Sequence, residues 1–167
     1  MHIDKFLGKR VEIPEDRRYV KKTGLWAKLE NETIVFGLSE PALTLAGGFN
    51  DFNWLVSEGE TVAIGQSVGV AITQKLLYLD APVDGVIHPN EGLPYDPQKV
   101  IEDPYGSGWL FKIEPPSAKP FFLTLAEPRD YLESLRGSEG FKNPEGKKGG
   151  ISPMCKAVYH SIREQKF

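Results

Sequence analysis

The chain has 167 residues and a formal net charge of −3 at pH 7, and 40% of its residues are hydrophobic and 26% charged. This length and composition can bury the core of one domain with short appendages. The acidic balance lacks the basic field that a nucleic-acid surface requires, and no apolar run is long enough to span a bilayer, so we expect neither partner. Met1 to Gly8 carries no charged-then-apolar leader, which favours the cytoplasm or an organelle matrix.

The first forty residues predict an arm followed by a β-hairpin. Residues 1–22 are charged with two small apolar spots, which indicates a loose arm over 1–12 and then an edge segment. The runs 25–29 and 33–38 are rich in aromatic and β-branched residues and are separated by the polar turn 30–32. We therefore expect two antiparallel strands here.

A short helix is predicted after this hairpin. Ser39 can cap it by accepting a hydrogen bond from a free amide of the first turn, and Gly47 with Gly48 can end it. We expect Leu43 and Leu45 of this helix to be packed.

The aromatic segment 49–56 has two interpretations. It can form a half-exposed strand whose aromatic side chains cover the core, or it can present an aromatic contact surface to a partner protein. The strand is the simpler of the two, because its aromatics then need no partner.

The central stretch 67–85 predicts a hairpin with a lysine at its tip. Apolar and small residues alternate up to Thr73, the chain turns polar over 73–75, and an apolar run resumes at Leu76. Lys75 would then lie far from the core with its amine free to be acylated. This geometry suits a carrier protein.

Shorter elements follow the central hairpin. Residues 96–102 can form one or two helical turns with Asp96 as the cap, and 109–113 read as the last strand of the domain. Residues 127–136 read as a helix with Tyr131 and Leu135 on one face.

The end of the chain predicts a tether and a second helix. Residues 137–150 hold five glycines and mixed charges, which indicates a flexible linker, and 152–166 have the apolar spacing of a helix. Cys155 is the single cysteine, so no internal disulfide framework can form. At the start of that helix its thiolate would be favoured, which makes Cys155 a redox candidate; the alternative is a small residue packed under Tyr159.

Several segments together resemble a known family. The glycines and proline around the central hairpin resemble lipoyl and biotinyl attachment domains, and further segments resemble the H protein of the glycine cleavage system. These further segments occur in the family's order and are Ile13–Tyr19, Leu25–Trp26, Gly37–Ala42 and Glu102–Ile113. The resemblance covers roughly residues 13–115.

The resemblance implies an all-β, lipoyl-domain-like fold, a flattened barrel of two small sheets (a barrel-sandwich hybrid) with short flanking helices. The C-terminal helical extension is predicted from the residue spacing alone and does not match the family. The domain organisation that follows is an N-terminal arm (1–12), the lipoyl-carrier domain (13–116), a flanking helix (117–136), a flexible linker (137–150) and a C-terminal helix (151–167). The resemblance also implies that the protein is a carrier component and not an enzyme, with no catalytic residue of its own.

By the same resemblance, Lys75 carries lipoate in amide linkage, attached by a lipoate ligase or lipoyl transferase. The arm would accept an aminomethyl group from glycine decarboxylase, present it to an aminomethyltransferase and be reoxidised by dihydrolipoyl dehydrogenase. The scattered histidines His2, His88 and His160 do not suggest a metal site.

The chain departs from the family pattern beside the lysine. The family usually has an acidic residue three positions before it, where this chain has Ile72, and there is one residue fewer between Lys75 and Pro82. Both departures concern recognition by the attaching enzyme. A biotin carrier is not favoured, because Gln74 and Leu76 stand where methionines commonly flank the biotinylated lysine.

Two alternatives to the glycine cleavage carrier stay open on the sequence alone. One is a lipoate-binding carrier that works in sulfur oxidation with heterodisulfide-reductase-like complexes. The other is an unmodified relative that acts as an interaction module.

Overall fold

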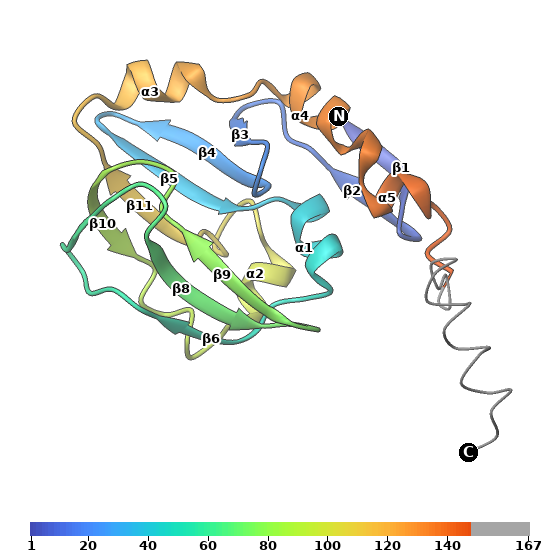
Figure 1. Cartoon of the computed structure of the whole chain (residues 1–167), viewed down its shortest axis with the longest axis horizontal. Helices are drawn as coiled ribbons and strands as arrows, with labels where there is room; N and C mark the ends of the chain where they lie inside the picture. The colour runs from blue at the N-terminus through green and yellow to red at the C-terminus, as the bar shows by residue number, and fades with distance from the viewer. Residues whose placement is uncertain (148–167) are drawn as a thin grey trace, which may run out of the picture.

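The computed structural model describes residues 1–147. Within them, the chain forms two facing β-sheets with short helices at one side and a small N-terminal sheet beside those helices (Figure 1). The predicted second helix, Cys155 and residues 148–150 of the predicted linker lie outside the described residues.

The larger sheet has six antiparallel strands. Their order across the sheet is β3 (Arg18–Val20), β4 (Leu25–Glu30), β5 (Thr33–Leu38), β11 (Phe111–Glu114), β10 (Gly85–Pro89) and β7 (Thr61–Val62). The predicted β4–β5 hairpin is confirmed, with Glu30 opposite Thr33 and Asn31 in the turn at φ 58°. Asparagine tolerates this left-handed conformation, which tight hairpin turns require.

The smaller sheet has three strands and carries the central hairpin. Its order is β6 (Asn50–Trp54), β8 (Ser67–Ile72) and β9 (Leu76–Asp80). The aromatic segment is the predicted core-covering strand, since Phe49 and Phe52 are buried and stack at 5.2 Å. The contact-surface interpretation of that segment loses its basis, because these rings already face the core.

The main core fills the space between the two sheets. Phe36 of β5 and Phe111 of β11 lie 5.4 Å apart between ring centroids, and the Trp54 ring of β6 meets Phe111 edge-on from the other sheet. The two sheets remain separate, and the architecture is the predicted mostly-β sandwich with short helices.

The helices lie at the edges of this sandwich. They are α1 (Glu40–Ala46), α2 (Gln98–Glu102), α3 (Ala118–Thr124), α4 (Pro128–Ser134), the 3-10 turn η1 (Leu135–Gly137) and α5 (Glu139–Lys142). The predicted flanking helix over 117–136 is in fact α3 and α4 with η1, because the chain between the two α-helices pairs Ala126 with Tyr19 of β3 at 2.9 Å in both directions.

Two details of the helices differ from the prediction. Ser39 does cap α1, but Leu45 is 41% exposed, because a helix of two turns buries only the stripe that holds Leu43. Helix α2 forms where predicted, but Pro97 occupies its N-cap position and no side chain caps it, so Asp96 does not have that role.

The N-terminal arm is not loose. Residues 2–12 form an antiparallel hairpin of β1 (His2–Phe6) and β2 (Lys9–Glu12), which turns at Leu7 and Gly8 with positive φ at both. Phe6 and Val11 are fully buried, and they build a second core with Tyr131 and Leu135 of the C-terminal helices. The two apolar spots of the sequence therefore form one packed face.

The described part of the predicted linker is also ordered. Residues 137–147 include α5, where Gly140 lies directly under the Phe6 ring and Phe141 meets it edge-on at 6.0 Å. Glycine serves close packing here, because a Cβ at Gly140 would overlap the ring.

Candidate functional site

The tip of the β8–β9 hairpin holds Lys75. Ile72 pairs with Leu76, which leaves Thr73, Gln74 and Lys75 as the loop. The amide of Thr73 donates to the carbonyl oxygen of Lys75 at 2.8 Å, and the Thr73 hydroxyl donates to the same oxygen at 2.8 Å. The loop backbone is thus closed on itself, while the Lys75 side chain is exposed and forms none of the ion pairs found within residues 1–147.

The inner face of the hairpin is anchored in the main core. Ala71 and Leu79 are buried and Leu77 packs against the same cluster. Gly69 allows the Phe52 ring to lie against the backbone of β8, because a Cβ added at Gly69 would be only 2.6 Å from that ring. The base of the hairpin is therefore fixed, and its tip projects beyond the sheet (Figure 1).

The outer face of the hairpin is apolar as well. Val70 pairs with Tyr78 and Ile72 with Leu76, so the four side chains share the face away from the core. Ile72, Leu76 and Tyr78 are 48%, 56% and 55% exposed. We call these four residues the outer rim; it begins at the loop that holds Lys75.

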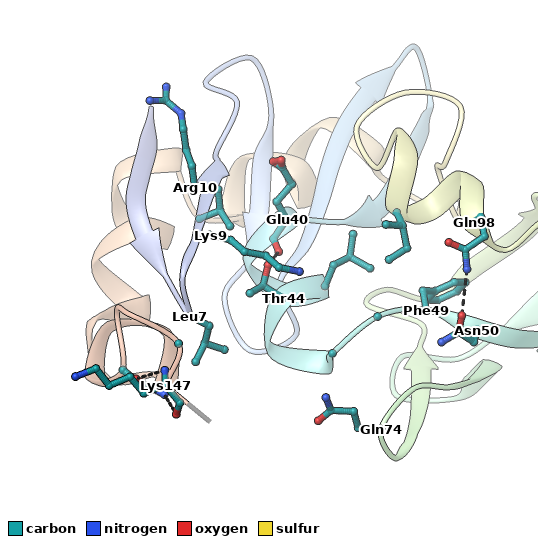
Figure 2. Close-up of a pocket in the computed structure, with 17 residues that line it drawn as sticks. Leu7, Lys9, Arg10, Glu40, Thr44, Phe49, Asn50, Gln74, Gln98 and Lys147 are labelled. Carbon is teal, nitrogen blue, oxygen red and sulfur yellow. Dashed lines mark hydrogen bonds between the residues drawn. The ribbon is translucent and has the colours of Figure 1, made fainter. Parts of the chain in front are cut away.

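Gln74 connects the loop to a cavity. Its side chain lies against Gly47, the C-cap of α1, which has a left-handed backbone conformation. A Cβ added at Gly47 would come within 2.8 Å of the side-chain amide carbon of Gln74. The cavity beside it has a volume of about 710 Å³ and lies between the hairpin tip, α1, the β1–β2 turn and the segment after α5 (Figure 2).

The cavity walls combine polar and apolar side chains in similar proportion. Lys9 points across toward Thr44, and Leu7 with Lys147 form the far wall (Figure 2). Glu40 of α1 accepts a hydrogen bond from the amide of Glu12 at 3.1 Å, and burial raises the pKa of its carboxyl. A loose arm over residues 1–12 is not compatible with this cavity, and the prediction of that arm is wrong here. The signal in the sequence is the Leu7–Gly8 turn between apolar residues.

The buried hydroxyls near α1 serve packing. Tyr131 shares a hydrogen bond of 2.7 Å with Ser39, and burial raises the pKa of Tyr131 to about 12. The Tyr105 hydroxyl donates to the carbonyl of Glu12 and accepts from the amide of Glu40, and burial raises its pKa as well. Both hydroxyls stay protonated at neutral pH. The Tyr105 hydroxyl holds α1 against β2, and the Tyr131 hydroxyl holds the start of α1 against α4.

No group of three or more His, Cys, Asp or Glu within residues 1–147 is arranged to hold a metal ion. In the same residues, no helix is both long enough and apolar enough to cross a membrane. Cys155, the redox candidate, lies outside the described residues, so its redox role stays a prediction.

Comparison with known proteins gives consistent matches. Residues 17–137 match the family model of the glycine cleavage H-protein. The chain belongs to the glycine cleavage H-protein family. The glycine cleavage system H protein of Pseudoalteromonas atlantica is 36% identical over 134 residues, which cover 78% of this chain and 94% of that protein. The H protein of Thermus thermophilus is 34% identical over 111 residues, 63% of this chain and 82% of that protein.

A solved structure agrees with the sequence matches. The crystal structure of a glycine cleavage system H protein from Mycobacterium marinum superposes with a TM-score of 0.59 at 27% identity, over 72% of this chain and 97% of that one. As a member of the H-protein family, the chain is a lipoyl carrier, a non-catalytic component of a multienzyme system. The resemblance noted in the sequence and the predicted fold class are both confirmed.

Proposed function

We propose that Lys75 carries the lipoyl group in amide linkage and that the protein shuttles an aminomethyl group in glycine cleavage. The observation that supports this most is the position of Lys75, the lysine of the exposed loop between β8 and β9. An acyl group fits there, because the side chain is exposed and the loop closes through its backbone without using the amine.

The protein's own residues supply position. The buried inner face of the hairpin holds the attachment point, and amide formation removes the charge of Lys75. When bound, the lipoyl group supplies a dithiolane on a long arm, which performs the transfer chemistry.

The proposed partners are those of the family: glycine decarboxylase, an aminomethyltransferase and dihydrolipoyl dehydrogenase, together with a lipoate ligase or lipoyl transferase. The cytoplasm is the proposed compartment, and cell fractionation with an antibody to the protein would test it. The relatives matched are named as glycine cleavage system H proteins, which favours this role over a sulfur-oxidation carrier and over an unmodified module.

Mass spectrometry of protein purified from its own cells tests the attachment. We expect a lipoyl-sized adduct on the peptide that contains Lys75, its complete loss in Lys75→Arg, and its retention in the control Lys119→Arg, which changes an exposed lysine on α3. Both variants should unfold at the wild-type temperature, because both side chains are exposed. Bare lysine at position 75 in the wild type would refute the proposal.

Reconstitution with the partner enzymes tests the pathway. The lipoylated protein should support glycine decarboxylation, and Lys75→Arg should not. The result that would contradict this role is a lipoylated protein that is inactive with glycine but exchanges sulfur-containing groups with sulfur-pathway enzymes. It would support the sulfur-oxidation carrier instead.

A further inference from the structure

The outer rim is the feature that the carrier role does not yet explain. Ile72, Leu76 and Tyr78 are each about half exposed and lie on one face of the hairpin, where Ile72 pairs with Leu76 and Val70 pairs with Tyr78. Scattered exposed apolar residues are normal, but a contiguous exposed cluster marks an interaction surface.

The rim lies where one partner must touch it. An enzyme that acylates Lys75 has to bring the acyl carbon to bonding distance of Nζ, and the loop is only three residues long. The first strand pair, Ile72 and Leu76, is then inside the contact area. Enzymes that act on the far end of a long attached arm have no such constraint, so the rim fits the attaching enzyme best.

We propose that the outer rim is the docking surface of the enzyme that attaches lipoate to Lys75, and that this enzyme presents an apolar surface around its acyl donor. The proposal rests on the lipoylation of Lys75 proposed above. It also accounts for Ile72, which stands where the family usually has an acidic residue: apolar burial replaces charge pairing in recognition at this position.

The reaction at the rim is a simple acyl transfer. The unprotonated Nζ of Lys75 attacks the carbonyl carbon of an activated lipoyl donor, an acyl adenylate. A C–N amide bond replaces the C–O bond of the donor, AMP leaves and the amine loses one proton, so nothing is oxidised or reduced. Docking of the rim brings the loop to the donor and takes no part in the bond changes.

The test measures attachment rates on the full-length unmodified protein with the purified lipoate ligase of its own cells, lipoic acid and ATP, followed by intact mass. The double variant Ile72→Thr/Leu76→Thr removes apolar area but keeps residues that suit a strand. We expect kcat/KM for attachment to fall by about tenfold, as the loss of partial burial of two side chains implies, mainly through KM.

A matched control uses another exposed apolar residue. Ile64 is 66% exposed and lies in the turn before β8, at the end of that strand away from the loop. Ile64→Thr should be acylated at the wild-type rate. The wild-type rate should also change little between low and high salt, because apolar docking is not screened.

The outcomes separate the two proposals. Failure of the wild type to be acylated at all refutes the proposed function and this inference with it. If the wild type is acylated and the double variant is acylated at the same rate, the inference is refuted but the proposed function stands. The same holds if the wild-type acylation rate falls steeply as the salt concentration rises. If the double variant is acylated normally but then fails in glycine decarboxylation, the rim belongs to a later partner and the inference is wrong.

Discussion

Gly37 shows how a single missing side chain fixes part of this fold. It pairs with Trp26 across β4 and β5, and a Cβ on it would lie within 2.5 Å of the indole nitrogen. The indole is held in place because its Nε1 donates to the carbonyl of Pro104 at 2.9 Å and the Arg17 guanidinium lies over the ring at 4.7 Å. The ring therefore has no room to move aside.

Gly37→Ala should consequently destabilise the protein by about 1–3 kcal/mol through overpacking. The control is Gly137→Ala, since an added Cβ at Gly137 meets nothing within 4 Å. Urea denaturation of both variants checks this, and the control should lose no stability. An equal, small effect of the two substitutions would show that the indole adjusts.

At the residue scale, the sequence was informative wherever a side chain acts locally. Ser39 was predicted as a helix cap from its neighbours alone, and it accepts from the amide of Ala42 at 3.3 Å. Its second partner, the Tyr131 hydroxyl, lies 92 residues away and left no local signal. Lys75 was found in the same local way, from the alternation and turn that surround it, and its lipoylation stays a prediction.

The N-terminal hairpin and α5 are elements that support each other. The Phe6 ring packs between Gly140 and Phe141 of α5, and the Lys5 ammonium meets Glu145 at 2.7 Å beyond it. The hairpin turn adds a further link, because the amide of Gly8 donates to the carbonyl of Pro144 at 2.8 Å.

Phe6→Ala should cost about 3–5 kcal/mol, since it leaves a cavity in a small core. It should also release α5, which hydrogen exchange would detect as lost protection of the amides at 141–143. Leu55→Ala, at a residue that is 52% exposed, is the matched control and should leave both properties unchanged. Retained protection of α5 in Phe6→Ala would contradict the mutual support.

The predictions of a loose N-terminal arm and a flexible linker are wrong for the described residues, and the reason is physical. The glycines of 137–150 predict flexibility, but Gly140 serves close packing because the Phe6 ring occupies the space where its side chain would be. Likewise, a register shift between Ile3 and Phe6 interrupts the alternation of β1, so the buried residues of the charged arm do not follow a regular strand pattern in the sequence. Composition alone therefore cannot distinguish a linker from a tightly packed contact.

The stability of the whole molecule should depend on pH through His88. Its Nδ1 lies 2.8 Å from a Glu58 carboxylate oxygen and its Nε2 3.0 Å from one of Glu114, so one ring joins the loop after β6 to β10 and β11. The hydrogen bond to Glu58, together with the one to Glu114, raises the pKa of His88 above its ordinary value, against a smaller opposing effect of burial.

The sign follows from the raised pKa. The folded state holds the proton more tightly than the unfolded state, whose histidine pKa is about 6.5. The stabilisation is therefore complete below that unfolded pKa and is lost as the pH rises through the folded one. Unfolding free energies across this window should decline in the wild type and not in His88→Gln, whereas His2→Gln should keep the decline. A pH-independent wild type would refute the role of His88.

At the scale of the whole molecule, the sandwich was predictable because each strand pair has its own alternation and turn. The central hairpin and the β4–β5 hairpin each contain all the residues that define them, and the family resemblance supplied their arrangement. The second core was not predictable, because its two halves come from opposite ends of the described chain.

That second core sets an order of folding during synthesis. Phe6 and Val11 leave the ribosome early, but Tyr131, Leu135 and Phe141, which cover them, emerge more than a hundred residues later. The two-sheet sandwich, with α3 packed against it, needs nothing beyond about residue 125, so it can close first and offer Trp26 and Val35 as a surface on which both ends dock. A nascent chain stopped before α4 would therefore have a folded β8–β9 hairpin, but the apolar residues of its N-terminal segment would lack their packing partners. We expect chaperones to bind this segment and not the hairpin.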